Sequence, residues 1–398
     1  MDAKKVRVFS AIMLGFSYMI WFIGLKPHRC VTEFIYISSE DGNIYSVYNC
    51  ESDIHQITHD GTKENNYYFF SNEMWSADGE KVLIGKNGHG YVLDINQTII
   101  IDIGNWVENM VWSENDKYIL VTQSKGGDPY VVDKQLTVVD ENTFEHIYET
   151  TGTGGLWINN FEILTFQVES IHNPGGSYLQ NLEVINISTK NINKLPIQID
   201  SYIAPIREGR LSPSGKYLAA MSPSPLSLTV VDMNKNKSYK SQTSVYIGEN
   251  PESGLISNGF NWALENDVMV FCHFFEQSIY VIEGEENIRK LGDQSCGYSS
   301  NLEWMNDNCF SVETHTRQIG IYCLDGTKEL LNLFPEFLQV DRGPWWSPDK
   351  NRVTIISDKG LYMANYSKGD INLEFEFFND AISFSWAPKK SWFQSMFK

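Results

Sequence analysis

Short runs of apolar residues, separated by clusters of polar turn residues, recur along nearly the whole of the 398-residue chain. Each copy begins with an aromatic or large apolar residue, continues through small or polar residues into a turn, and ends in an apolar run, as in Trp75-Ser-Ala-Asp-Gly-Glu-Lys-Val-Leu-Ile. The copies start at Trp75, Trp112, Trp157, Leu211, Trp262, Trp304, Trp346 and Trp386, 37 to 54 residues apart. A period of about 44 residues is typical of the four-stranded blades of a β-propeller.

A second pattern keeps the same period. After each turn comes a run rich in β-branched residues that ends in an acid or an Asn, at Asp94, Asp140, Asn186, Asp232, Glu283, Asp325 and Asn365. Alternating apolar residues predict strands, and Asp, Asn and Gly predict the turns that follow them. Two marks with one period predict a repeated unit, and blades that cannot bury both faces alone must stack around an axis.

The two ends of the repeat region predict how the ring closes. Residues 34–58 contain a second, a third and a fourth strand without a first, whereas Asp380–Trp386 is a first strand without the other three. Joined, they complete one blade, and closure removes the exposed edges of the sheets. We therefore expect an all-β fold of eight four-stranded blades over residues 31–390, with seven blades as the alternative because the region between Trp157 and Trp262 is stretched.

The amino terminus differs from the rest of the chain. Val8–Leu25 is uncharged over eighteen residues, which as a helix spans about 27 Å, close to the thickness of a bilayer core. Because Lys4, Lys5 and Arg7 precede this run, we expect residues 1–30 to form a cytoplasmic end and a single membrane anchor, with the propeller exported. A cleaved signal peptide and lipidation at Cys30 remain as alternatives. Residues 391–398 are expected to form a short tail.

Charge restricts the partners of the exported part. The formal net charge is −19, and residues 1–30 hold five cations and one anion, which leaves −23 for the remainder. Such a surface repels phosphate backbones, so we expect no nucleic-acid partner. It is also unsuited to anionic lipid.

The repeat resembles a known family. Trp75-Ser-Ala-Asp-Gly-Glu-Lys, Leu211-Ser-Pro-Ser-Gly-Lys and Trp346-Ser-Pro-Asp-Lys are similar to the W-S-P-D-G-K repeats of TolB-like, WD40-like propellers, and the similarity extends over about residues 34–390. The copies at Trp157, Trp304 and Trp386 lack the Ser-Pro-Asp-Gly core. The resemblance implies a propeller fold but no particular activity, because the repeat is a packing and turn device. No G-x-S-x-G nucleophile motif is present, so we expect no attached serine peptidase.

Candidate binding residues come from the position four before each repeat start, at the beginning of the innermost strand. This position is polar in seven of the eight copies: Ser71, Glu108, Thr153, Arg207, Asn258, Ser300 and Arg342, with Ile382 in the last. A hydrated central funnel in which Glu108, Arg207, Asn258 and Arg342 capture a ligand or peptide is one interpretation, since Arg suits a carboxylate. A wet channel without a ligand is the other. Trp106, Trp345 and Trp392 fall outside the period and are either surface anchors or ordinary packing residues.

The six cysteines show no metal-binding spacing. If a disulfide exists, Cys309 and Cys323 are the first candidates, since they fall on neighbouring strands of one predicted blade; buried free thiols are the alternative. The histidines occupy no equivalent repeat positions, so we expect neither a metal site nor another cofactor.

The sequence thus predicts a membrane-anchored, extracytoplasmic propeller that binds a protein or a small ligand. The alternative is a lyase or hydrolase of acidic or glycan substrates with its site at the central funnel. An enzyme of this kind needs a paired acid and base, and near the rim only Glu73, Glu108, Glu303 and Asp341 are available.

Overall fold

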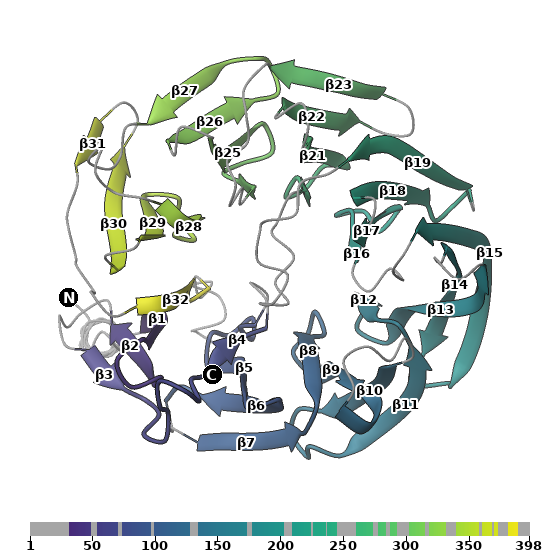
Figure 1. Ribbon diagram of the computed structural model, residues 1–398, viewed down its shortest axis with the longest axis horizontal. Helices are drawn as coiled ribbons and strands as arrows, with labels where there is room; N and C mark the ends of the chain where they lie inside the picture. Colours follow the sequence, from purple (N-terminus) through teal and green to yellow (C-terminus); the bar gives the residue numbers. More distant parts are fainter. Residues whose placement is uncertain are drawn as a thin grey trace, which may run out of the picture.

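A computed structural model of the chain contains eight four-stranded antiparallel sheets arranged as the blades of a ring (Figure 1). It describes residues 32–48, 54–70, 74–96, 99–127, 134–172, 177–202, 209–223, 226–235, 237–244, 260–273, 278–283, 287–292, 302–314, 318–331, 340–357, 360–367, 370–372 and 381–388. The prediction of eight blades is confirmed, and the alternative of seven is wrong. The anchor sequence Val8–Leu25 lies outside the described residues.

The first four blades follow one another along the chain, and in each the strands are ordered from the axis outward. Blade 1 consists of β4 (Tyr68–Phe69), β5 (Lys81–Lys86), β6 (His89–Asp94) and β7 (Ile99–Gly104), and blade 2 of β8 (Val107–Trp112), β9 (Tyr118–Ser124), β10 (Lys134–Asp140) and β11 (His146–Gly152). Blade 3 consists of β12 (Gly155–Asn159), β13 (Glu162–His172), β14 (Ser177–Asn186) and β15 (Asn191–Tyr202), and blade 4 of β16 (Gly209–Leu211), β17 (Tyr217–Pro223), β18 (Leu226–Asp232) and β19 (Lys237–Ser244). A short 3-10 helix, η1 (Lys125–Gly127), follows β9.

The remaining blades complete the ring. Blade 5 consists of β20 (Phe260–Trp262), β21 (Val268–His273), β22 (Ser278–Glu283) and β23 (Asn287–Gly292), and blade 6 of β24 (Glu303–Trp304), β25 (Cys309–Glu313), β26 (Ile319–Cys323) and β27 (Lys328–Leu331). Blade 7 consists of β28 (Val340–Trp346), β29 (Arg352–Ser357), β30 (Gly360–Ser367) and β31 (Asp370–Asn372). Blade 8 combines β32 (Ala381–Trp386) with β1 (Thr32–Ser38), β2 (Ile44–Tyr48) and β3 (Ile54–Gln56).

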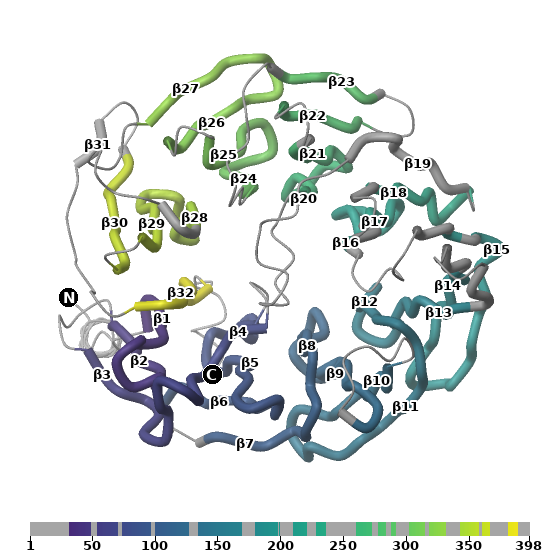
Figure 2. Tube along the Cα trace, in the orientation of Figure 1, coloured from purple at the N-terminus to yellow at the C-terminus, as the bar shows by residue number. Residues whose placement is uncertain are grey.

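Blade 8 closes the ring as the sequence predicts. Its innermost strand β32 comes from the carboxy-terminal part of the chain and pairs antiparallel with β1, Phe34 opposite Trp386 and Tyr36 opposite Phe384. Figure 2 shows this yellow strand beside the purple strands of the amino-terminal part. Pairing the first and last described strands joins the two ends of the chain, so no inner blade edge is left open at the junction.

The tryptophans at the repeat starts link neighbouring blades. In five blades the indole N–H donates to the carbonyl oxygen of the residue just before the repeat start of the preceding blade. These bonds are Trp112 to Met74 (2.9 Å), Trp157 to Val111 (3.1 Å), Trp262 to Arg210 (3.0 Å), Trp304 to Asn261 (3.2 Å) and Trp386 to Trp345 (3.3 Å). Trp75 and Trp346 donate instead to the hydroxyls of Ser385 and Ser311. The ring of each Trp therefore fills the space between blades while its only polar atom is satisfied.

The polar residues of the repeat build the turns. In Ser76-Ala-Asp-Gly, the Ser76 hydroxyl donates to Asp78 Oδ1 (2.8 Å) and accepts from the backbone N–H of Lys81 (2.9 Å). Gly79 adopts the positive φ of 66° that ends the turn. Ser347 and Asp349 repeat the contact at 2.6 Å. The acids that end the third strands act similarly, since Asp140 Oδ1 accepts from the two N–H groups of the following turn. Both sequence patterns are thus explained by local folding.

The strand directions give the ring two different ends. The first strand of a blade runs to its Trp, so hairpins between strands 1 and 2 and between strands 3 and 4 lie at one end, which we call the hairpin face. Connections between strands 2 and 3, and from strand 4 to the next blade, lie at the other end, the loop face. Because Thr32 and Phe34 pair beside Tyr48 and Trp386, β1 begins and β32 ends at the hairpin face.

Candidate functional site at the loop face

The structure describes the four predicted ligand residues to different extents. Glu108 is the second residue of β8 and its side chain is described. Arg342 lies in β28, but its side chain is outside the described residues, as are Arg207 and Asn258 altogether. The capture of a ligand or peptide by these four residues therefore stays a prediction.

Glu108 is held within its own blade. The register of β8 and β9 shifts between Val107 and Asn109, so Glu108 is the extra residue of a β-bulge, a distortion that redirects a side chain. Its carboxylate accepts hydrogen bonds from Lys134 Nζ (2.6 Å) and from the Ser124 hydroxyl. Lys134 Nζ also lies 3.2 Å from Ser124 Oγ. The three groups come from the adjacent ends of β8, β9 and β10, where the register pairs Lys134 with Ser124.

Burial distinguishes the two partners of this ion pair. The Lys134 side chain is 0% exposed, whereas that of Glu108 is 28% exposed. A buried ammonium requires a nearby anion, so Glu108 balances a charge under the rim while it keeps one side open to solvent. Lys134 was not among the sequence candidates, because it occupies the first position of a third strand and carries no repeat signal.

In blade 3, the residue equivalent to Glu108 is Thr153, which is not exposed to solvent. Thr153 is buried, accepts from Gln180 Nε2 at 2.8 Å and donates to the carbonyl of Phe166 at 3.3 Å. Polarity at this sequence position therefore does not by itself indicate a ligand contact. Beside Glu108, the buried Oδ1 of Asn109 has no hydrogen-bond partner among the described residues.

Blade 1 has a second ion pair at the same face. Lys86 ends β5 and reaches back to Asp60, with Nζ 2.7 Å from Oδ2, and the hydroxyl of buried Tyr67 donates to Oδ1 at 2.7 Å. The hydrogen bond from Lys86 lowers the pKa of Asp60, against the opposing effect of burial. No sequence signal points to this cluster, because Asp60 lies in a connection and Lys86 follows an apolar run.

Trp106 lies between these two clusters in sequence and behaves unlike the tryptophans of the repeat. Its side chain is 51% exposed and its backbone is left-handed, with φ of 56°. A bulky residue rarely adopts this conformation. The backbone is fixed because Ser124 N–H donates to the Trp106 carbonyl (2.8 Å) and Val107 N–H donates to that of Gly88 (2.8 Å). The other two non-periodic tryptophans differ: Trp345 is partly buried near Phe384, and Trp392 lies outside the described residues.

Of the four acids considered for an enzymatic site, the structure describes the side chains of Glu108 and Glu303, and these two are far from forming a catalytic pair. Glu303 precedes Trp304 at the hairpin end, where its Oε1 lies 2.6 Å from Lys350 Nζ and its Oε2 accepts from the backbone N–H of Trp346. Burial raises the pKa of Glu303, although Lys350 opposes the shift. Glu108 is at the opposite face. The side chains of Glu73 and Asp341 are outside the described residues, and no cluster of metal-ligating side chains occurs within the described part.

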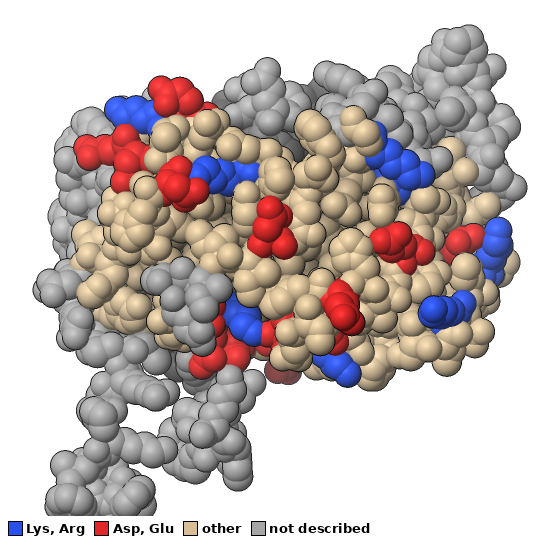
Figure 3. Space-filling model, turned by 90° about the horizontal axis from the view of Figure 1, so that it is seen from below, with Lys and Arg blue, Asp and Glu red and all other residues tan. Residues whose placement is uncertain are grey.

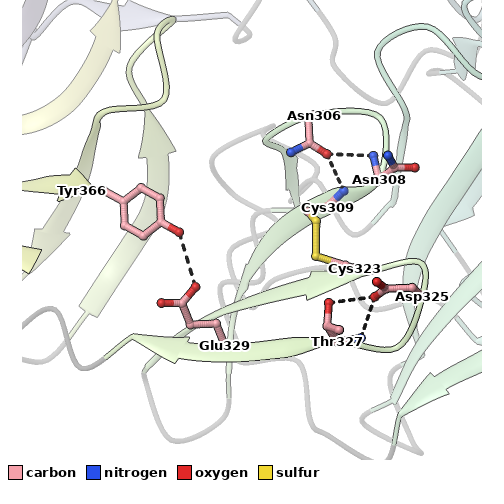
Figure 4. The surroundings of a disulfide bond; sticks show 8 residues. All are labelled: Asn306, Asn308, Cys309, Cys323, Asp325, Thr327, Glu329 and Tyr366. Atoms are coloured by element: carbon pink, nitrogen blue, oxygen red, sulfur yellow. Dashed lines mark hydrogen bonds between the residues drawn. A yellow bond between two sulfur atoms is a disulfide. The ribbon is translucent and has the colours of Figure 1, made fainter. Parts of the chain in front are cut away.

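Blade 6 contains a disulfide between the two cysteines that the sequence puts first. Cys309 and Cys323 are directly opposite each other on β25 and β26 and are joined by a disulfide (Figure 4). The adjoining turn is held by Asn306, whose Oδ1 accepts from the backbone N–H groups of Asn308 and Cys309. Cys272 is disulfide-bonded too.

Comparisons with known proteins identify the fold only. No family model matches the chain, and no curated protein matches it. Among solved structures, it is similar to the dihydro-heme d1 dehydrogenase NirN in complex with DHE, with a TM-score of 0.54 and 13% identity over 92% of this chain and 76% of that one. It is also similar to a eukaryotic initiation factor, with a TM-score of 0.53 and 10% identity over 91% of this chain and 100% of that one. A chain of a mitotic checkpoint complex matches with a TM-score of 0.50, 9% identity and coverage of 74% and 86%.

These neighbours are β-propellers of the WD40-like kind, so the chain is an all-β propeller scaffold. Their printed roles differ widely, and identities this low carry no activity over to this chain. The specific likeness to TolB-like repeats has no matching family model behind it. Within the described residues, no helix is long and apolar enough to span a membrane.

Proposed function

We propose that this protein is an exported, membrane-anchored propeller whose loop face binds a protein or small-molecule partner. The observation that carries the proposal is Trp106, an exposed indole fixed in a left-handed backbone beside the partly open Glu108–Lys134 pair. Unfavourable backbone conformations persist where the surroundings enforce them, and they concentrate at binding sites. An exposed Trp offers a large contact area at a small entropic cost, which makes it a frequent anchor of interfaces.

Export is supported by two observations of different kinds. The uncharged run Val8–Leu25 after Lys4, Lys5 and Arg7 has the length and flanking charge of a membrane anchor whose carboxy-terminal side is exported. The disulfide between Cys309 and Cys323 belongs to an oxidising compartment, since such bonds are rare in reducing cytosol.

The rim of the funnel completes the proposed binding surface. Glu108 would contribute its open side, and Arg207, Asn258 and Arg342 would contribute donors from blades 4, 5 and 7. Arginine forms paired hydrogen bonds with carboxylates, so an acidic group of the partner would be held there while an apolar part rests on Trp106.

The test uses the full chain in the membranes of its own cells. A photoreactive residue in place of exposed Asn105 should form a discrete adduct with the partner. Trp106→Ala and the double variant Arg207→Ala/Arg342→Ala should each reduce that adduct at least tenfold. Phe161→Ala, on the hairpin face, is the matched aromatic control and should leave the adduct unchanged. The same adduct in every correctly folded variant would rule out this face as the binding surface.

A further inference from the structure

Large exposed apolar side chains collect at one end of the ring. Among the described residues eight such side chains are exposed, and six of them lie at the hairpin face. Phe161 (44% exposed) and Leu264 (58% exposed) are in hairpins between first and second strands, and Ile54, Ile147, Ile192 and Ile288 are at the starts of fourth strands. Of the other two, Trp106 belongs to the loop face and Leu330 to the outer strand of blade 6.

The chain enters the ring at this same face. β1 begins at Thr32 on the hairpin face, only seven residues after Leu25, the last residue of the uncharged run. Seven residues span at most about 25 Å when fully extended. A bilayer that held Val8–Leu25 would therefore lie within about 25 Å of the start of β1.

The segment between the proposed anchor and β1, which we call the tether, would hold only the blade 8 side of the ring near the membrane. Whether the whole ring lies flat on the membrane then depends on the exposed side chains of Phe161 and Leu264, which we call the apolar tips. Blades 3 and 5, which carry Phe161 and Leu264, are across the ring from blade 8, where the tether enters (Figure 1). If the ring lies flat with its hairpin face on the membrane, both apolar tips reach the lipid interface. If the ring stands upright on its edge, both remain in water. On the side of the ring drawn in Figure 3, acidic and basic side chains of the described residues are interspersed and form no basic patch.

We propose that the hairpin face rests on the lipid surface of the membrane and that the loop face, with Trp106 and Glu108, points away from it. This orientation rests on the proposed membrane anchor. The contact would come from apolar side chains at the interface rather than from charge, because the exported part carries −23. Zwitterionic lipid is therefore the favoured surface, and anionic lipid should weaken the contact.

The orientation can be measured by fluorescence quenching. The full chain is reconstituted in phosphatidylcholine vesicles whose headgroups carry a quencher, with a fluorophore at Glu265→Cys on the hairpin face or at Lys125→Cys on the loop face. We expect quenching at position 265 to exceed that at position 125 at least threefold. Adding Phe161→Ser and Leu264→Ser to the Glu265→Cys chain should lower its quenching at least twofold.

Each outcome decides a different claim. Equal quenching at both positions, or stronger quenching at 125, in a chain that stays with the vesicles would overturn the orientation and leave the anchor intact. A chain that does not stay with the vesicles would overturn the anchor and this inference together. Unchanged quenching in the double serine variant would overturn the role of the apolar tips. Vesicles of phosphatidylglycerol should give weaker quenching at 265, and stronger quenching there would contradict an apolar contact.

Discussion

The hairpin face and the loop face of this propeller are built by different rules. At the hairpin face, residues of the same types recur from blade to blade. Their side chains form hydrogen bonds within the turns and to the neighbouring blade. Asp116 Oδ2 accepts from Ala77 N–H of blade 1 (2.7 Å), Asn160 accepts from Asn115 N–H of blade 2 (2.8 Å), and Asp307 accepts from Glu265 N–H of blade 5 (2.8 Å). Repetition at this face therefore indicates a structural role.

At the loop face, by contrast, the polar groups described for blades 1, 2 and 3 differ from one another. Blade 1 has Lys86 with Asp60, blade 2 has Lys134 with Glu108 and Ser124, and blade 3 has buried Thr153 with Gln180. Departure from the repeat, as in Trp106, is what separates candidate binding residues from scaffold. The predictions below use matched pairs of residues to challenge that division.

The largest effect is expected at a repeat tryptophan. Trp304 is 1% exposed and donates to Asn261 of blade 5, so Trp304→Ala should lower the free energy of unfolding by about 3–5 kcal/mol through the cavity and the lost hydrogen bond. Urea denaturation measures the change, with Trp304→Phe as the variant that keeps most of the packing. A loss below about 1 kcal/mol for the alanine variant would contradict the linking role.

Removal of the buried lysine should have the next largest effect. Lys134→Met keeps the volume but leaves Glu108 and Ser124 without their shared donor, which should cost about 1–3 kcal/mol in unfolding free energy. Lys125→Met, an exposed lysine on the same face, is the control and should change stability by no more than about 0.5 kcal/mol. Equal effects of the two substitutions would mean that the ion pair does not stabilise blade 2.

A smaller effect is expected at the blade 1 pair. The folded pKa of Asp60 is lowered, so this group stabilises the fold above its usual pKa of 3.8, and that contribution is lost as the pH falls through the lowered value. Lys86→Met should raise the pKa of Asp60, followed by NMR titration of its carboxyl carbon, and should reduce stability near neutral pH by about 1 kcal/mol. Lys63→Met, in the same connection, should leave the titration of Asp60 where it is.

The smallest effect is expected at the hairpin face itself. Burial, with the nearby charge of Asp78, raises the pKa of Asp116, so its ionisation disfavours the fold as the pH rises from below 3.8 through the raised value. Asp116→Asn keeps an acceptor for Ala77, as Asn160 does in blade 3, and should change unfolding free energy at neutral pH by no more than about 0.5 kcal/mol. As the pH rises through this range, the unfolding free energy of the Asp116→Asn variant should increase relative to that of the wild type, as measured by urea denaturation at a series of pH values. The control variant Glu114→Gln should show no such pH-dependent gain.

Sequence patterns predicted the scaffold well because the scaffold is where local chemistry repeats. First strands end at the repeat residues Trp112, Trp262, Trp304, Trp346 and Trp386, the last of them as predicted for Asp380–Trp386. The third strands β6, β10, β14, β18 and β22 end at the expected acid or Asn. The last two third strands differ slightly. β26 stops at Cys323, two residues before Asp325, and β30 continues to Ser367 because Tyr366 and Ser367 still pair with β31.

The candidate site could be predicted only in part, because its contacts join residues without a shared pattern. The position of Glu108 in the repeat predicted it as a candidate. Its contacts with Lys134 and Ser124 require a β-bulge at Glu108, and no local sequence pattern predicts that bulge. Trp106 was noticed only because it breaks the period. Its left-handed backbone follows from contacts with Gly88 and Ser124, which only the assembled blades bring together.

The division between scaffold and binding residues is tested most directly by comparing the full-length variants Trp106→Ala and Trp304→Ala. For each variant, two quantities are measured: the yield of the partner adduct from position 105 and the free energy of unfolding. We predict that Trp106→Ala loses at least nine-tenths of the adduct while its unfolding free energy stays within about 1 kcal/mol of wild type, and that Trp304→Ala loses several kcal/mol of stability. An adduct that survives Trp106→Ala, or a Trp106→Ala variant as destabilised as Trp304→Ala, would contradict the account.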